Sequence, residues 1–262
     1  MTTWLLFRGL TRESRHWGDF PEIFQAACPE AEILCLDLPG NGVLYRQDSP
    51  ADVLAMAEYC RAELRQRGIA GPVHLLAMSL GAMVAVAWAA RYPEEIAGAV
   101  LINTSLRPFS PFYQRLRPRS YGRLLRFLWP GDSTAAAEVR ILRLTSNRAA
   151  APELVAAWAA YRREQPVALA NALRQLLAAV RYRAPVAAPA IPLLVLASRG
   201  DQLVNPDCSR RLARLWQTAF AEHANAGHDI PLDDGPWVAE QIGAWRQTAV
   251  PPRRREIPTP VE

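Results

Sequence analysis

Apolar runs and helical patterns alternate along most of the chain. The apolar runs occupy residues 3–9, 31–42, 72–78, 96–105, 190–198 and 218–225. Most of them are continuous rather than alternating in polarity, which is typical of strands whose two faces are both covered by helices. Helical patterns occupy residues 15–28, 49–68, 80–93, 206–216 and 235–247. The alternation predicts an α/β protein with a mostly parallel central sheet flanked by helices.

Residues 106–186 break this alternation. Four helical patterns follow one another there without an intervening strand, at residues 120–131, 133–147, 151–166 and 167–183. We therefore expect a core formed by residues 1–105 and 187–248, with residues 106–186 as a helical insertion between two strands. The remaining residues, 249–262, are rich in proline and arginine, a composition that predicts a disordered tail.

The overall composition is that of a globular protein. The chain has 262 residues, of which 50% are hydrophobic, enough for one sizeable core. We find no signal-peptide pattern at the N-terminus and no apolar run long enough for a membrane span. The four cysteines, Cys28, Cys35, Cys60 and Cys208, lack the spacing of a metal site. We therefore expect a cytoplasmic protein with free thiols, no transmembrane segment and no metal site.

Positive charge is concentrated in the predicted insertion. All 30 basic residues are arginine, and 14 of them lie between residues 107 and 183, beside four acidic residues. Such a field can steer an acidic partner, and the mixture of arginine with apolar residues at 113–129 suits an acidic carrier protein or an anionic surface. A solvated arginine face is the simpler interpretation. No nucleic-acid-binding module accompanies the charge, so we expect no nucleic-acid partner.

A serine, an aspartate and a histidine follow three of the predicted strands. Ser79 follows residues 72–78, Asp201 follows residues 190–198, and His228 follows residues 218–225. The carboxyl ends of parallel strands meet at one edge of a sheet, so we expect functional side chains to gather there. A serine becomes a nucleophile when a histidine takes its proton and an acid orients that histidine. The three residues therefore predict a catalytic triad.

The sequence AMSLG places Ser79 on a turn from strand to helix. Ala77 and Gly81 are small enough for the close packing that a nucleophile elbow needs. The N–H of Leu80 then lies at a helix start, and that of Leu10 lies in the loop after the first strand, so both are candidate donors to an oxyanion. Taken alone, a serine in such a position is more often a helix cap. The prediction depends on the later aspartate and histidine.

Other titratable residues have simpler interpretations. His74 and His223 lie within predicted strands, where a packed structural role is favoured, and His16 is interpreted as a structural hydrogen-bonding residue. Asp207 competes with Asp201 for the role of the acid. It follows a proline, however, and fits the start of a helix, where a carboxylate stabilises free N–H groups. We favour Asp201.

Five segments of the chain resemble the α/β-hydrolase family: LLFRGL, LDLPGNG, HLLAMSLGAM, LASRGDQLV and ANAGHDIPLD. The resemblance implies Ser79 as the nucleophile, His228 as the base and Asp201 as the acid, with Leu10 and Leu80 as oxyanion donors. It also implies that the helical insertion caps the active site and that no cofactor is needed.

Two residues depart from the family pattern. Ala77 stands where the elbow usually begins with glycine, and Arg8 stands where many members have histidine before Gly9. Alanine is still small, so Ala77 leaves the elbow intact. Arg8 either binds a carboxylate of the substrate or pairs with a nearby acid, and we favour the acid pair.

Together these features predict a serine hydrolase of the carboxylesterase type that acts on a small-molecule ester through an acyl-enzyme. One alternative is a hydrolase of acyl thioesters, or of methyl esters on an acyl-carrier protein, that docks its partner on the arginine-rich insertion. Another is a non-catalytic, ligand-binding member of the family. A reactive Ser79 would distinguish both hydrolases from the non-catalytic member, since only the hydrolases require a nucleophilic serine.

Overall fold

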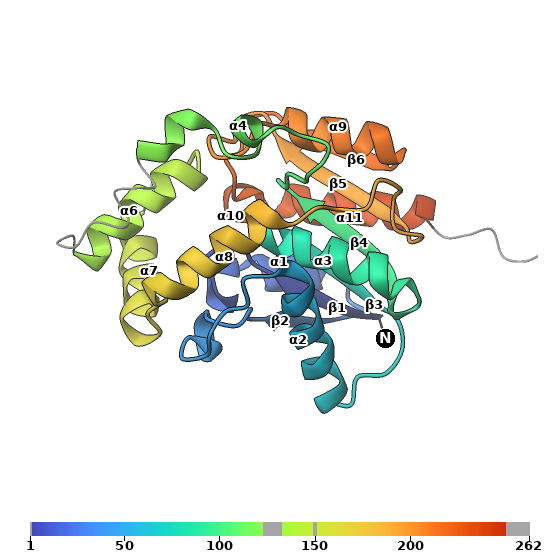
Figure 1. The fold of residues 1–262 in the computed structure, drawn as a ribbon, viewed down its shortest axis with the longest axis horizontal. Coiled ribbons are helices and arrows are strands. Elements are labelled where there is room, and N and C mark those ends of the chain that lie inside the picture. Colours follow the sequence, from blue (N-terminus) through green and yellow to red (C-terminus); the bar gives the residue numbers. More distant parts are fainter. Residues whose placement is uncertain (1, 123–132, 149–150, 250–262) are drawn as a thin grey trace, which may run out of the picture.

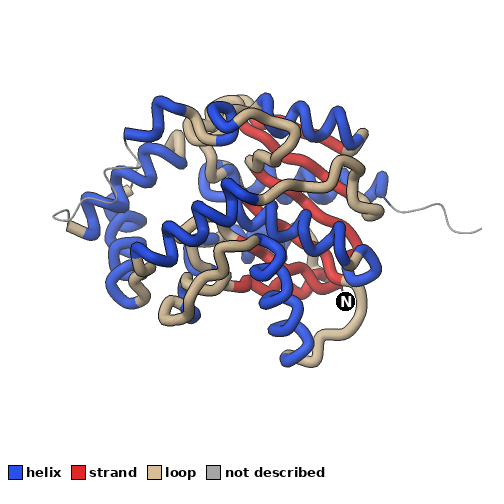
Figure 2. Tube along the Cα trace, viewed as in Figure 1, coloured by secondary structure: helices blue, strands red, loops and turns tan. Residues whose placement is uncertain are grey.

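A six-stranded sheet, parallel throughout, lies at the centre of the computed structural model, which describes residues 2–122, 133–148 and 151–249. The strands are β1 (Thr2–Phe7), β2 (Ala31–Leu36), β3 (Val73–Met78), β4 (Ile96–Ile102), β5 (Leu193–Ser198) and β6 (Ala219–His223). Their order across the sheet is β2-β1-β3-β4-β5-β6. Five of the strands lie within apolar runs of the sequence, and β1 begins one residue before its run, at Thr2. The sheet and the helices on either side of it are visible in Figures 1 and 2. The predicted α/β class is confirmed.

Continuous apolar runs form the inner strands because helices cover both faces of the sheet. All six residues of β5 are buried, and so are the last four of β1. β6, at the edge, has no fully buried residue. The position of a strand, inner or at the edge, therefore accounts for whether its apolar run contains polar residues.

Two layers of helices enclose the sheet. The helices α2 (Val53–Gln66), α3 (Leu80–Arg91) and α9 (Asp207–Trp216) contribute to the apolar core on one face. The helices α1 (Phe20–Ala27) and α11 (Gly235–Ala249) contribute to the core on the other face. α3 is buried at every position from Leu80 to Ala89. The helix that follows Ser79 is thus fixed in the interior of the molecule.

Helices occupy the region between β4 and β5. They are α4 (Phe112–Arg115), the 3-10 turn η4 (Pro118–Ser120), α6 (Thr134–Thr145), α7 (Pro152–Glu164) and α8 (Leu169–Arg181). Figure 1 shows α6 and α7 beyond the carboxyl ends of the strands, with α8 crossing back toward the sheet. Three of the helical patterns expected within residues 106–186 correspond to α6, α7 and α8. Most of the fourth, at 120–131, and nearly all of the expected tail at 249–262 lie outside the described residues.

Buried polar contacts join this insertion to loops at the carboxyl edge of the sheet. Glu138 of α6 is fully buried and accepts hydrogen bonds from Arg12 (2.8 Å) and from Arg162 of α7 (2.6 Å). The N–H of Asp229 donates to the carbonyl of Thr145 at the end of α6 (2.7 Å). These contacts hold α6 and α7 against the loops in which the candidate residues lie.

Two elements differ from the prediction. Residues 15–28 have one continuous helical pattern, but Gly18 takes a φ of 54° and separates a 3-10 turn, η1 (Ser14–Trp17), from α1. Proline in the first turn of α1 needs no N–H partner there. The first strand ends at Phe7 rather than at Gly9, so residues 8–10 form a loop at the carboxyl edge of the sheet.

Candidate functional site

Ser79 lies between β3 and α3 in a backbone conformation that is rare for serine. Its φ is 54° and its ψ is −118°, a sparsely populated region that costs about 1–3 kcal/mol. The end of β4 holds it there, because its N–H donates to the carbonyl of Ile102 (3.0 Å) and its carbonyl accepts from the Thr104 hydroxyl (3.1 Å). The Ser79 side chain caps no N–H group of α3. The helix-cap interpretation therefore fails, and the turn has the geometry of a nucleophile elbow.

Two glycines allow the backbone to approach Ser79 closely. A Cβ on Gly9 would lie 3.1 Å from the Cβ of Ser79, and a Cβ on Gly81 would lie 2.6 Å from the carbonyl oxygen of Arg8. The second distance is shorter than any side chain tolerates, so Gly81 is required by the packing. Ala77, in contrast, is fully buried within β3, and the turn forms with alanine at this position.

Two backbone N–H groups near this turn are left free by the described part of the fold. Leu80 is the first residue of α3, and N–H groups in the first turn of a helix have no acceptor within the helix. Leu10 lies in the turn after β1, directly after Gly9. Neither N–H donates a hydrogen bond to another residue among those described. Both can therefore donate to an oxygen atom bound beside Ser79.

His228 and Asp201 contact each other from the loops after β6 and β5. The Nδ1–H of His228 donates to Oδ2 of Asp201 at 2.7 Å. The other carboxylate oxygen accepts from the N–H groups of Leu203 (2.8 Å) and Val204 (2.9 Å). Both side chains are buried. The carboxylate thus fixes the proton on Nδ1 and leaves Nε2 as a proton acceptor.

Charges around His228 raise its pKa. Burial acts to lower the pKa of His228, but the Asp201 carboxylate raises it through its charge and its hydrogen bond, and Asp229 adds to this. The Arg8 guanidinium acts in the opposite direction. The balance is a pKa above the ordinary histidine value of 6.5, which strengthens the ring as a base.

Asn103, at the end of β4, holds the histidine loop. Its side-chain amide donates to the carbonyls of His228 (2.8 Å) and Gly227 (3.2 Å), and its Oδ1 accepts from the N–H of Ser198 (2.9 Å). Its φ of 44° is a conformation that asparagine tolerates better than most residues. Asn103 is not among the residues expected from the sequence, because only a nucleophile, a base and an acid were expected at the strand ends. Asparagine adopts a positive φ more readily than most residues, so an asparagine directly after an apolar run is the sequence signal for such a turn.

The end of β4 thus contacts both the serine turn and the histidine loop. Ile102 and Thr104 bond to the backbone of Ser79, while Asn103, between them, bonds to the backbone of His228. No hydrogen bond joins Ser79 Oγ to His228 within the part of the chain that is described. In many enzymes this bond tightens only in the substrate complex.

Arg8 forms a buried ion pair with Asp229, the residue after His228. Nη1 donates to Oδ1 (3.1 Å), and Nη2 donates to Oδ2. Both side chains are 3% exposed, and the guanidinium carbon lies 4.8 Å from the centroid of the Trp17 ring. Of the two roles considered for Arg8, the pair with a nearby acid matches this geometry. The terminal guanidinium nitrogens are engaged by the protein's own carboxylate.

The remaining titratable candidates have structural partners. The His74 ring stacks on Trp4 with centroids 4.6 Å apart, and burial lowers the pKa of His74 to about 4. His223 accepts hydrogen bonds from two N–H groups of the turn after β6. His16 packs edge-on against an aromatic ring of α7, and Asp207 begins α9 and pairs with an arginine one turn later.

Neither the cysteines nor any acidic cluster forms a metal site in the described residues. The four cysteines are free, and burial raises the pKa of the Cys60 thiol to about 12. Within residues 2–122, 133–148 and 151–249, no group of three or more His, Cys, Asp and Glu side chains could hold a metal ion.

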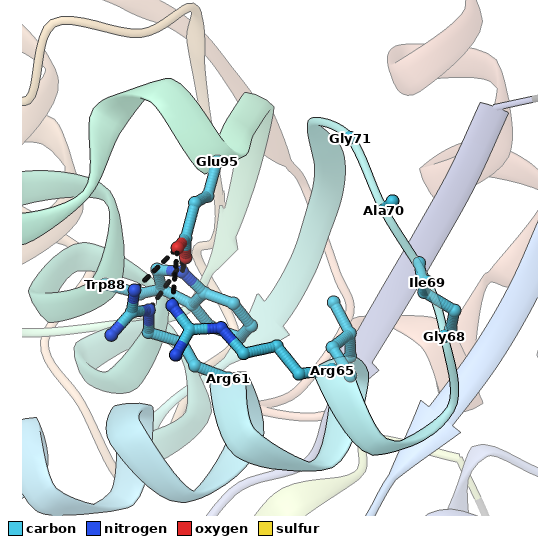
Figure 3. Close-up of a pocket in the computed structure, with 9 residues that line it drawn as sticks. Arg61, Arg65, Gly68, Ile69, Ala70, Gly71, Trp88 and Glu95 are labelled. Carbon is cyan, nitrogen blue, oxygen red and sulfur yellow. Dashed lines mark hydrogen bonds and ion pairs between the residues drawn. The ribbon is translucent and has the colours of Figure 1, made fainter.

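A pocket near the C-terminal end of α3 is organised by ion pairs rather than by reactive groups (Figure 3). Glu95 accepts hydrogen bonds from Arg61 Nε (2.7 Å) and Trp88 Nε1 (2.8 Å). The hydrogen bonds from Arg61 are the largest cause that lowers the pKa of Glu95, to about 2. No serine, cysteine or histidine lines this pocket. It offers neither a nucleophile nor a histidine base.

A family model and a curated protein match this chain in sequence. The model of the "Alpha/beta hydrolase family" matches residues 4–241. A segment of the polyketide synthase ThaQ from Burkholderia thailandensis is 30% identical over 233 residues. The match covers 82% of this chain but only 10% of that protein, so the chain spans about a tenth of the length of this curated relative.

Solved structures share the fold at low sequence identity. A protein assigned as a lipase (lip1) from Acinetobacter baumannii is 23% identical, with a TM-score of 0.76 over 95% of this chain and 84% of the other. A thermophilic esterase from Thermogutta terrifontis is also 23% identical, with a TM-score of 0.73 over 95% of this chain and 90% of the other. At these identities the likeness extends to the fold alone.

Proposed function

The chain belongs to the alpha/beta hydrolase family, and on that premise we propose that it is a serine hydrolase that cleaves carboxylic esters. One observation carries this proposal. Ser79 occupies a strained turn at the carboxyl edge of the sheet, and the end of β4 connects that turn to the loop of His228, whose ring is held by Asp201. A serine, a base and an acid in this arrangement provide the parts of an activated nucleophile.

In the proposed acylation step, Ser79 Oγ attacks the ester carbonyl carbon while Nε2 of His228 takes the hydroxyl proton. Asp201 stabilises the imidazolium that forms. The N–H groups of Leu80 and Leu10 donate to the carbonyl oxygen as it becomes an oxyanion. The alcohol leaves with the proton from Nε2, and the acyl group stays on the serine.

In the deacylation step, a water molecule replaces the alcohol. His228 takes one proton from this water as its oxygen attacks the acyl carbon, and the same two N–H groups hold the second oxyanion. The carboxylic acid leaves as Ser79 recovers its proton from His228. The side chain of Asp201 holds the His228 ring in place through both steps.

Hydrolysis of p-nitrophenyl esters of increasing acyl length, with two serine variants, tests this proposal. Ser79→Ala should retain the unfolding free energy and lower kcat/KM at least about 10³-fold. Ser133→Ala is the matched control, because the Ser133 hydroxyl caps α6 by accepting from the N–H of Ala136 (3.2 Å). It should lose about 1 kcal/mol of stability and keep its activity. A folded parent without activity would support the non-catalytic alternative, and a Ser79→Ala variant as active as the parent would contradict the role of Ser79.

Hydrolysis of an acyl thioester is a second candidate. It is supported by the likeness to a segment of a polyketide synthase and by the excess of arginine at residues 107–183. The same serine chemistry applies, with a thiol as the leaving group. Matched oxygen and sulfur esters of one acyl chain, free and carrier-linked, separate the candidates. A kcat/KM for the carrier-linked thioester that exceeds that of the free oxygen ester, and that falls steeply with salt, favours the second.

A further inference from the structure

The helix α8 presents an apolar face to solvent. Leu169, Leu173, Leu176, Leu177 and Val180 are each between 38% and 53% exposed, and we call these five residues the α8 stripe. Their spacing places them on one face of the helix. A surface helix of a globular protein ordinarily buries such a face and exposes its polar residues, so α8 has the reverse arrangement.

Polar side chains anchor the opposite face of α8 to the core. Asn171 and Gln175, on that face, are 3% and 0% exposed. Asn171 accepts from the N–H of Ser49 (2.9 Å), and Gln175 accepts from the N–H of Thr11 (2.9 Å) and donates to Asn41 Oδ1 (2.8 Å). Rotating α8 to bury its stripe would break these bonds. The outward direction of the stripe is therefore fixed by the fold.

Exposed apolar side chains are concentrated around this stripe. Twelve large hydrophobic residues of the described chain are exposed, and eight of them lie on α8, just after it or on α4. Besides the stripe they are Val186, Phe112 and Tyr113. α4 contacts the C-terminal end of α8, where Arg115 Nη2 donates to the carbonyl of Ala179 (2.6 Å). Such a concentration of exposed apolar groups is typical of an interaction surface.

Unpaired positive charge lies at the same end of α8. Arg107 and Arg183 are bridged through their backbones, and both are exposed, as is Arg181. None of the three forms an ion pair within the described residues. The sequence has no acidic residue between positions 165 and 200. The surface that adjoins the stripe is therefore complementary to a negatively charged partner.

The shape and size of this surface favour a lipid surface over a protein. Eight exposed apolar side chains and three arginines are far fewer than the ~20–30 residues per side of a stable protein interface. Exposed leucine and valine side chains can insert shallowly at the boundary of the acyl chains. The neighbouring arginines can pair with anionic headgroups. α8 is only about 20 Å long, and no helix in the described part of the chain has the length and apolarity to cross a bilayer.

We propose that the α8 stripe docks the protein on an anionic lipid surface, with its apolar side chains at the acyl-chain boundary and Arg107, Arg181 and Arg183 against lipid phosphates. α8 then lies in the plane of the surface. The polar anchors of α8 reach the loops after β1 and β2 at the carboxyl edge of the sheet. Docking through α8 thus brings that edge of the sheet close to the lipid.

Sedimentation with vesicles tests this proposal on the full chain. We expect binding to phosphatidylcholine vesicles with 30 mol% phosphatidylglycerol, and at least tenfold weaker binding to phosphatidylcholine alone. Leu173→Glu with Val180→Glu should lower binding at least tenfold, and Arg181→Gln with Arg183→Gln should lower it severalfold on the anionic vesicles only. Leu215→Glu, at an exposed leucine of α9 outside the stripe, should bind like the parent. Circular-dichroism melts confirm that each variant is folded.

Three results would overturn the docking surface. The first is a parent protein that fails to bind the anionic vesicles, and the second is a Leu173→Glu, Val180→Glu variant that binds them as tightly as the parent. The third is a concentration-dependent dimer, or a complex with an acidic carrier protein, that this variant abolishes while vesicles bind neither form. Ser79→Ala should bind vesicles like the parent, so failure of the docking and failure of the proposed hydrolysis are separate outcomes.

Discussion

Arg8 and Asp229 are 221 residues apart in the chain and meet in a buried pair beside His228. Two nearly parallel hydrogen bonds join the guanidinium to the carboxylate, a geometry that restricts both side chains. Asp229 raises the pKa of His228, and Arg8 lowers it. The pair therefore fixes the backbone next to the histidine and adjusts the basicity of its ring.

The first prediction concerns the pH dependence of ester hydrolysis. The base must be neutral to act, so kcat/KM should rise with pH and reach half its plateau above pH 6.5, because the pKa of His228 is raised. Asp229→Asn removes a charge that raises this pKa and should move the midpoint to lower pH. Arg8→Gln removes a charge that lowers it and should move the midpoint to higher pH. Shifts of both variants in the same direction would contradict this account.

The second prediction concerns stability. Removing one partner leaves the other buried and unpaired, so Arg8→Gln and Asp229→Asn should each lower the free energy of unfolding by about 3–5 kcal/mol. The double variant Arg8→Met, Asp229→Leu should recover most of this loss, because no buried charge remains. Urea unfolding at pH 7 measures all three. A double variant less stable than either single variant would show that the pair is not the source of the cost.

The third prediction concerns Asn103 as a positioning residue. Asn103→Asp keeps the acceptor for the Ser198 N–H but loses both donors to the histidine loop. We expect kcat to fall about 10–100-fold with KM little changed, because a displaced base loses its alignment. Asn171→Asp is the matched control, since Asn171 also donates to a loop carbonyl and accepts from a loop N–H, away from the histidine loop. Equal losses in the two variants would contradict a role specific to the histidine.

The fourth prediction concerns the packing of the serine turn. Gly81→Ala would place a Cβ 2.6 Å from a backbone carbonyl and should lower the free energy of unfolding by at least ~2 kcal/mol. Gly243→Ala, on α11 with open space around it, should raise it by about 0.5–1 kcal/mol. Ala77→Gly should cost about 1 kcal/mol and leave kcat/KM unchanged within about twofold. Thermal or urea unfolding and ester hydrolysis provide the comparison.

The sheet was predictable from local pattern, but its contacts were not. Continuous apolar runs mark strands covered on both faces. Five strands lie within the predicted runs, and β1 begins one residue before its run. The break at Gly18 was missed because a positive φ leaves no trace in the hydrophobic period. The spatial order β2-β1-β3-β4-β5-β6 depends on tertiary pairing, which periodicity does not encode.

The candidate site was predictable where chemistry follows strand ends. Asp201 and His228 were identified by their positions after strands, and the structure brings them into contact. Their catalytic roles, like that of Ser79, stay predictions. Asp229 is not among the site residues expected from the sequence, and its partner Arg8 lies at the far end of the chain. Pairs between residues so far apart in the chain cannot be predicted from local sequence pattern. The outward direction of the α8 stripe cannot be predicted in this way either, because it depends on the amides that anchor the other face of the helix.

The reactivity of Ser79 is the central claim, and intact-mass spectrometry after treatment with a fluorophosphonate probe tests it most directly. The parent should gain one adduct per chain, which peptide mapping places on Ser79, and His228→Ala should react at least about 10³-fold more slowly. Ser79→Ala should remain unmodified. A folded parent that stays unmodified, or a Ser79→Ala variant that gains the adduct as fast as the parent, would contradict the account.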